Sequence, residues 1–285
     1  MNLFYSETQI AEWREVFALP EVQSNGTSVF RGQSADWNLQ PSLVRTLKDL
    51  EEPPELWLSD EYLLLKEFKR RAHLYQQDLP RDDDIVSWLA LMQHHGTPTR
   101  LLDFSYSFFV ACYFAFANSN AAVFSISDGW LRSAGTQIAR GPKSEIRLRE
   151  EELKTQYLHA NRFLADVHLH HRGGGPGFDD LSKGVLMLEP ERQIERLAIQ
   201  QGLFLMPLNL HLPFLKNMDH NAASIESVSD DWKRSTKSYV KKIVFSKEAR
   251  MEGLCALKNM NITGESLFPG IDGFARSLVH TVLAS

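Results

Sequence analysis

The chain has 285 residues, of which 43% are hydrophobic and 24% charged, the composition of a folded globular protein rather than of a disordered segment. Its formal charge of -5 is spread along the sequence, so composition shows no basic footprint for nucleic acid. The longest apolar stretch, 108–117, is about half of the ~20 residues that a membrane span needs. We therefore expect one cytoplasmic domain over 1–285, with its core at about 24–283 and no membrane contact.

The N-terminal part predicts a helix followed by a strand. Three apolar residues recur at helical spacing after Ser6, a good capping residue, which predicts a helix over 6–18. The β-favouring residues 28–30 predict a strand that delivers Arg31 at its end. Gly32 then permits a close approach of another backbone.

Two more helices are expected before residue 97. Ser59 opens the first, Asp84 opens the second, and Gly96 ends it. Pro98 disfavours the helical conformation for the residue before it, so 97–103 is expected to be a loop or a short strand.

The second half of the sequence is richer in predicted strands. A helix opened by Ser107 comes first, and no glycine-rich dinucleotide fingerprint follows any strand. Helices early and strands late favour an α+β fold, with helices packed around a central, mainly antiparallel sheet. The later strands are expected at 122–126, 184–188, 203–208 and 239–245, and the later helices at 246–259 and 272–283.

Polar residues concentrate around a helix end and a proline turn between residues 93 and 103. They lie beside apolar residues, which indicates a half-buried polar site. We expect Arg100 and Asp103 to form an ion pair, either at the wall of a ligand cleft that also holds Arg31 or as a structural pair that pins the loop without catalysis. The polar members are Gln93, His94, His95, Thr99, Arg100 and Asp103.

Other patterns of catalytic residues are weaker. His168, His170 and His171 do not have the spacing of a zinc site, so we expect no metal. The sequence has no nucleophile elbow of the serine-hydrolase type. Cys112 and Cys255 lie in apolar helical patterns and are expected to be two buried, unreactive thiols.

Two motifs carry a resemblance to a known family. The first is Phe30-Arg31-Gly32-Gln33, and the second is the run Gln-His-His-Gly-Thr-Pro-Thr-Arg-Leu-Leu-Asp-Phe over 93–104. Together they resemble the FRG-domain family, which is named for the first tripeptide. The segments 111–115, 196–204 and 267–273 are similar to the family as well, so the resemblance extends over nearly the whole chain.

The resemblance implies a distant similarity to ADP-ribosyltransferases, with a split sheet and NAD as co-substrate. In those enzymes a first-strand arginine or histidine holds NAD, a second-strand hydroxyl supports the nicotinamide ribose, and a late glutamate stabilises the transition state. Arg31 matches the first position, Thr99 or Ser105 the second, and Glu265 is favoured over Glu195 and Gln200 for the third. The implied catalytic residues are Arg31, Glu265 and Gln200, and the implied NAD-binding residues are Arg31, Gly32, His94, Thr99, Arg100, Asp103 and Ser105.

The function so implied is transfer of ADP-ribose from NAD to a macromolecular acceptor, either protein or nucleic acid. Such chemistry harms the host cell, so we expect a toxin or anti-phage effector that a neutralising antitoxin protein controls. The alternative is a binding module that recognises a nucleotide or nucleic-acid fragment through Arg31 and Arg100 without chemistry.

Overall fold

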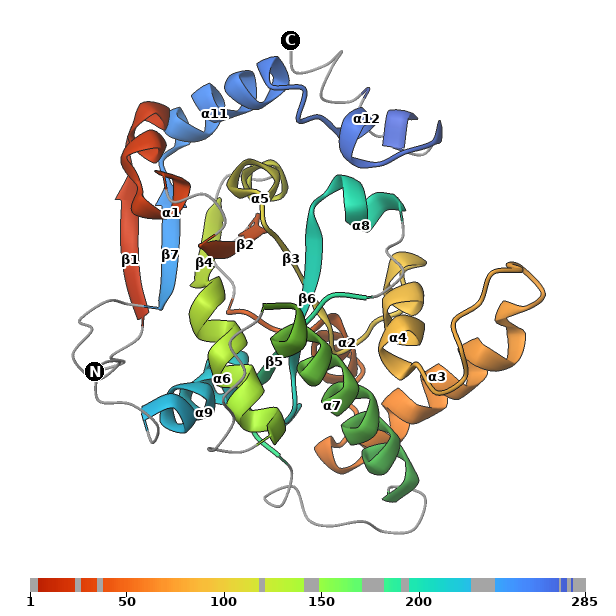
Figure 1. Cartoon of the computed structure of the whole chain (residues 1–285). Helices are drawn as coiled ribbons and strands as arrows, with labels where there is room; N and C mark the ends of the chain where they lie inside the picture. The colour runs from red at the N-terminus through yellow and green to blue at the C-terminus, as the bar shows by residue number, and fades with distance from the viewer. Residues whose placement is uncertain are drawn as a thin grey trace.

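A computed structural model of the chain describes most of the sequence (Figure 1). The described residues are 5–23, 27–34, 38–117, 121–140, 149–170, 182–190, 195–226, 239–271, 273–275 and 278. The predicted helix at 272–283 and the glycine-rich segment 172–177 lie almost wholly outside them.

In the described residues, seven strands form one sheet in the order β1-β7-β4-β2-β3-β6-β5. Only β1 and β7 run parallel, and every other neighbouring pair is antiparallel. The predicted α+β fold with a mainly antiparallel sheet is confirmed. The strands are β1 (Tyr5–Ile10), β2 (Ser28–Gln33), β3 (Leu102–Ser105), β4 (Ala122–Ser127), β5 (Val185–Leu188), β6 (Gly202–Pro207) and β7 (Val240–Phe245).

The helices surround this sheet (Figure 1). Before β4 the chain forms η1 (Trp13–Ala18), α1 (Pro20–Gln23), α2 (Ser42–Asp49), η2 (Pro54–Leu56), α3 (Trp57–Ala72), α4 (Ile85–His94) and α5 (Phe108–Ala115). After β4 it forms α6 (Asp128–Arg140), α7 (Arg149–His170), α8 (Glu195–Ile199), α9 (Phe214–Glu226), α11 (Lys247–Asn259) and α12 (Gly264–Leu267). No helix in the described ranges combines the length and the apolar character that crossing a membrane requires.

Several predicted helix starts are confirmed by capping hydrogen bonds. Asp84 accepts one from the Ser87 N–H at the start of α4, and Ser107 accepts one from the Val110 N–H at the start of α5. Ser246 caps α11 in the same way. These side chains satisfy backbone donors that a helix leaves unpaired in its first turn.

The predicted helix at 6–18 is wrong. Residues 5–10 form β1, which pairs in register with β7, and only 13–18 form a short 3-10 helix. Of the three apolar residues behind that prediction, Ile10 and Trp13 are buried against the sheet and α5, and Phe17 is about half exposed. A pairing partner more than 200 positions away cannot be seen in a local pattern.

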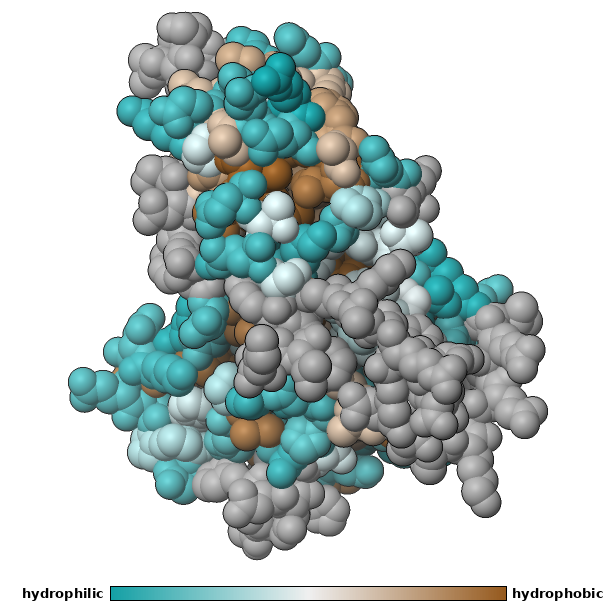
Figure 2. All heavy atoms as spheres, turned by 90° about the vertical axis from the view of Figure 1, so that its left-hand side faces the viewer, coloured by the Kyte–Doolittle hydropathy of each residue, from teal (hydrophilic) through white to brown (hydrophobic). Residues whose placement is uncertain are grey.

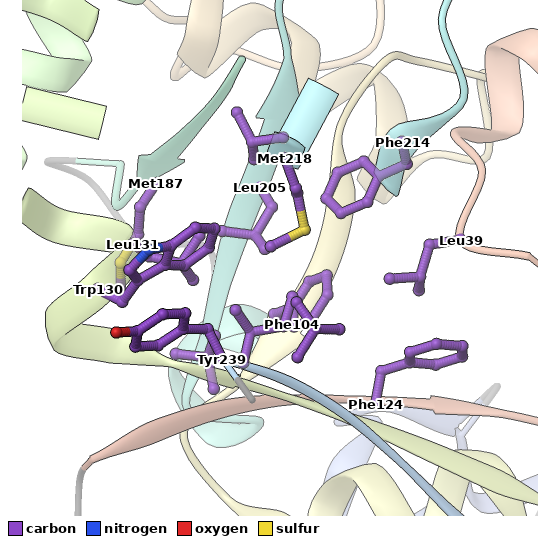
Figure 3. Packing of buried hydrophobic residues seen from close by; sticks show 14 of the residues in the cluster. Leu39, Phe104, Phe124, Trp130, Leu131, Met187, Leu205, Phe214, Met218 and Tyr239 are labelled. Atoms are coloured by element: carbon purple, nitrogen blue, oxygen red, sulfur yellow. The ribbon is translucent and has the colours of Figure 1, made fainter. Parts of the chain in front are cut away.

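Hydrophobic residues cover both faces of the sheet. On one face, α6 and α9 pack over the strands, and Trp130 of α6 stacks on Tyr239 with ring centroids 5.3 Å apart. Figure 3 shows this packing, with Leu205, Phe214 and Met218 close by. On the other face, η1, α5 and α11 cover residues such as Phe30.

The side of the molecule that carries β1 and β7 is mostly hydrophilic, with apolar atoms visible in its upper part (Figure 2). That part corresponds to the region of η1 and α11 in Figure 1. Phe17 and Met251, from these two helices, are about half exposed.

The sheet is split between β2 and β3. These strands pair at one register position only, Phe30 opposite Ser105, whereas β2 pairs along its full length with β4 on its other side. Arg31, Gly32 and Gln33 therefore lie beside a gap in the ladder. A split of this kind opens room inside the sheet without breaking the fold.

Candidate functional site

Arg31 lies at the split between β2 and β3. The sequence predicted it at the end of a strand, but it lies inside β2, a central strand of the sheet, opposite Phe124 of β4. Its Nη1 donates a hydrogen bond of 2.7 Å to the main-chain oxygen of Asp103 and lies 3.9 Å from that residue's carboxylate. The guanidinium thus bridges the gap where a main-chain ladder would otherwise continue.

A pocket of about 310 Å³ opens at this split. This volume is at the lower end of the range for small-molecule sites, ~300 to 1,000 Å³. Its walls come from β2, β3, α5 and α8, with one side chain from α2. The lining residues are Phe30, Arg31, Gly32, Gln33, Ser34, Arg45, Asp103, Phe104, Ser105, Val110, Ala111, Phe114, Arg196, Leu197, Gln200 and Gly202.

Gly32 is required by close packing at the pocket wall. A Cβ atom built on Gly32 would lie 1.9 Å from the Ala111 carbonyl oxygen, so no larger residue fits without moving α5. The prediction of a close backbone approach at this glycine is confirmed. Gly32 thereby holds β2 against α5 and fixes the position of its two neighbours.

The pocket is positively charged. Arg31, Arg45 and Arg196 line it, and Asp103 is the only acidic residue among the described lining residues. Burial lowers the pKa of Arg31, the charge of Asp103 opposes this shift, and the charge of Arg45 adds to it. A net charge of about +2 in a partly buried pocket favours an anionic ligand.

Ser105 and Gln200 line the pocket, and both have protein partners. The Ser105 hydroxyl donates to the main-chain oxygen of Gln200 at 2.7 Å and accepts from the Ser107 N–H. The Gln200 side-chain amide donates to the main-chain oxygen of Leu267 at 3.0 Å. These bonds tie β3, α8 and α12 together at one end of the pocket.

Arg100 does not pair with Asp103, which corrects the sequence prediction. Its guanidinium forms a two-point ion pair with Glu61 of α3, with a distance of 2.7 Å between Nε and Oε1, and both side chains are almost completely buried. A second bond reaches the main-chain oxygen of Leu208. Asp103 is left to contact Arg31 instead. Arg100 therefore lies away from the pocket and is not placed to bind a ligand there.

Glu61 is strongly acidic in this environment. Burial alone would raise its pKa, but the charge and hydrogen bonds of Arg100, with a contribution from His168, lower the pKa to about 2. His168 lies 3.5 Å from the Glu61 carboxylate. The three residues form a buried polar cluster that joins α3, α7 and the loop before β3.

Thr99 is also separate from the pocket. It is completely buried, and its hydroxyl donates to the side chain of Gln93. Its main-chain N–H and C=O both bond to Ser42, the first residue of α2. Thr99 therefore anchors α2, and α2 in turn places Arg45 at the pocket.

His94 lies in a smaller hollow that adjoins the pocket. This hollow shares Asp103, Arg196 and Gln200 with the main pocket. Burial lowers the pKa of His94, and the charges of His95 and Arg196 lower it further, which favours the neutral imidazole. His94 is placed near the site but not in its main wall.

Glu265 stands apart from the residues that line the pocket. It is exposed in the first turn of α12, which Thr263 caps. Glu195 is exposed as well, at the start of α8. Neither lines the pocket or the hollow beside it, so their placement gives no support to a catalytic role, and that role stays a prediction.

The remaining histidines and cysteines considered from the sequence lie away from the pocket where the structure describes them. His168 is buried against Glu61, the side chain of His170 and all of His171 lie outside the described residues, and no metal-holding group of three or more ligands occurs in the described part. Burial raises the pKa of the Cys112 thiol, as expected for an unreactive cysteine. Cys255 is exposed on α11, which corrects its predicted burial.

Sequence reasoning missed four lining residues with polar side chains, Gln33, Ser34, Arg45 and Arg196. Arg45 belongs to no motif that the sequence analysis recognised. It lies at the pocket because α2 packs on the loop at Thr99. Arg196 lies in the segment 196–204, which resembles the FRG-domain family, but the resemblance implied no role for this residue. Its guanidinium lies 4.5 Å from the centre of the Phe268 ring.

The comparison with known proteins finds one family over part of the chain. Residues 26–123 match the family model of the FRG domain. The FRG match spans roughly a third of the chain and contains both motifs that carried the resemblance, including Arg31, Gly32 and Asp103. Arg196 and Gln200 lie outside it. No curated protein and no solved structure matches the chain.

Proposed function

We propose that this chain is an ADP-ribosyltransferase-like enzyme that binds NAD in the pocket at the split between β2 and β3 and transfers ADP-ribose to a macromolecular acceptor. The observation that carries the proposal is the meeting of three arginines around one aspartate. The pyrophosphate of NAD carries two negative charges at neutral pH, and arginines are well suited to bind such a group.

The lining residues fit the chemistry of NAD cleavage. When the bond between ribose and nicotinamide breaks, nicotinamide leaves with the electron pair and positive charge develops on the ribose. Asp103 is the carboxylate available in the pocket to stabilise that charge. We therefore assign to Asp103 the role that the sequence had suggested for Glu265, and to Arg31 the role of holding NAD through a planar, charged donor.

Isothermal titration with NAD followed by product analysis tests the proposal. The expected result is saturable binding by the wild-type protein and release of one nicotinamide per ADP-ribose transferred. Incubation with labelled NAD and a cell lysate then shows whether the label follows protein or nucleic acid. Binding that is no tighter than that of an Arg45→Met, Arg196→Met double variant would contradict the assignment of the pocket.

A second function, binding of a nucleotide without chemistry, is favoured by one observation. Neither Glu265 nor Glu195 lines the pocket, so no glutamate is placed there among the described residues. Tight binding of NAD without nicotinamide release would support this second function over the first.

An enzyme that consumes NAD or modifies a cellular target would be harmful to its host. We accordingly place the protein among toxins or anti-phage effectors, under the control of a neutralising antitoxin protein. Growth arrest on expression of the wild type, and its absence on expression of the Asp103→Asn variant, would support this role. Equal toxicity of both forms would contradict it.

A further inference from the structure

Gln33 is a lining residue with an unusual environment. It is the last residue of β2, and the residue as a whole is only 5% exposed. Its Oε1 atom is buried and has no hydrogen-bond partner, and the same is true of the Nε atom of Arg31, two residues earlier. Both residues line the pocket. The protein thus leaves one acceptor and one donor unpaired at the same site.

The two unpaired atoms come from the same side of the strand. Residues two apart in a strand point to the same face and lie about 7 Å apart, whereas the residue between them points away. Gly32 is that intervening residue, and it packs against α5. Buried polar atoms in proteins are nearly always hydrogen-bonded, so an unpaired acceptor beside an unpaired donor in a pocket indicates groups that a ligand satisfies.

The other amide in the pocket differs in this respect. Gln200 donates its side-chain N–H to the main chain of Leu267, so its orientation is fixed by the protein. Gln33 is the lining amide whose carbonyl oxygen is left for another partner. A neutral carbonyl oxygen can accept a hydrogen bond but cannot donate one, so the matching ligand atom must carry a hydrogen.

We propose that Gln33 is a specificity-determining residue that recognises a carboxamide on the ligand. Its Oε1 accepts a hydrogen bond from the carboxamide N–H, and the Arg31 Nε–H donates to the carboxamide oxygen. This inference rests on the proposed function, because NAD carries such a group on its nicotinamide ring. It adds to that function a reason why NAD, rather than another dinucleotide of equal charge, is the substrate.

The test compares NAD with 3-acetylpyridine adenine dinucleotide, in which a methyl group replaces the amide nitrogen while the carbonyl group and the charge are kept. By titration calorimetry, the wild type should bind NAD about tenfold or more tightly than the analogue, because Gln33 is left unpaired by the methyl group. The Gln33→Met variant should bind NAD more weakly and show a ratio near one. Equal binding of the two dinucleotides by the wild type, or an unchanged ratio in Gln33→Met, would overturn the inference.

The controls separate this inference from the proposed function. Gln76→Met changes the same residue type in a different hollow, between α3 and α4, and should leave the ratio as in the wild type. If the wild type binds neither dinucleotide, both proposals fail; if it binds both equally well, only the role of Gln33 fails. A wild-type ratio near one overturns the inference whether or not the Gln33 variant folds.

Discussion

Arg31 and Arg100, which both lie in the stretch 26–123 that matches the FRG-domain model, form two very different ion pairs. Arg100 is fully buried and saturated, with Glu61 on one side and a main-chain oxygen on the other. Arg31 makes one short bond to a main-chain oxygen, lies 3.9 Å from the exposed carboxylate of Asp103, and keeps its Nε atom unpaired. Arg100 has its ion-pair and hydrogen-bond partners within the protein, whereas Arg31 has one donor atom, Nε, without a partner.

This difference separates a structural arginine in one motif from a candidate ligand-binding arginine in the other. A saturated buried pair stabilises a fold only if it is kept whole, because removing one partner leaves a charge without compensation. A loosely paired arginine in a pocket has donors left for a ligand. Both residues were candidates for ligand binding from the sequence, and the geometry of their partners now distinguishes them.

Breaking the saturated pair should have the largest effect. Glu61→Gln leaves Arg100 buried without a countercharge and should lower the free energy of unfolding by about 3–5 kcal/mol. Urea unfolding followed by circular dichroism measures this change. The matched control is Glu67→Gln on the exposed face of α3, whose partners Arg70 and Arg71 are in solvent. It should leave the unfolding midpoint unchanged, and a similar loss in both variants would argue against the comparison.

Acid should break the same pair in the unmodified protein. The pKa of Glu61 is about 2 in the folded chain, below its ordinary value of 4.5, so its contribution to stability is fully present above about pH 4.5 and is lost as the pH falls towards 2. The loss should be on the order of 3 kcal/mol. Urea midpoints measured from pH 6 to pH 2 should show it. Glu61→Gln should lack this part of the acid dependence.

Asp103→Asn tests the loose pair between Arg31 and Asp103. If Asp103 stabilises the charge that develops on the ribose, single-turnover nicotinamide release should fall about a hundredfold, with little change in the affinity for NAD or in stability. Glu265→Gln is the companion variant. Given its exposed position on α12, it should change neither the rate nor the affinity. The reverse pattern, with the loss at Glu265, would restore the assignment made from the sequence.

Arg31→Lys should have the smallest effect of the series. Lysine keeps the positive charge but loses the planar donor set, so the affinity for NAD should fall about tenfold while the unfolding midpoint stays as in the wild type. Titration calorimetry and thermal unfolding measure the two quantities. A large fall in stability would show that Arg31 holds the split sheet together rather than binding a ligand.

The sequence predicted most of the fold and part of the site. The strands at 122–126, 184–188, 203–208 and 239–245 were predicted to within two residues, because buried strands have strong local patterns. The first strand was missed, because its partner β7 is far away in the sequence. Helices α6, α7 and α9 were not predicted either.

Five of the residues predicted for the site lie around one pocket, but the predicted pairing of Arg100 is wrong. Arg31, Gly32, Asp103, Ser105 and Gln200 do line one pocket. Arg100 was assigned a partner three residues away, whereas its true partner comes from α3, and short spacing alone cannot reveal such a contact. Arg45 could not be found from the sequence, because only the docking of α2 brings it to the pocket.

The position of β7 has a consequence for how the chain reaches its native state. β7 lies between β1 and β4, so the strand made last in the chain separates two that are made earlier. During synthesis β1 has no neighbour in the sheet, and β4 has a free edge, until residues 240–245 have left the ribosome. Any fragment that stops before this strand would expose an unpaired strand edge, which is prone to aggregation.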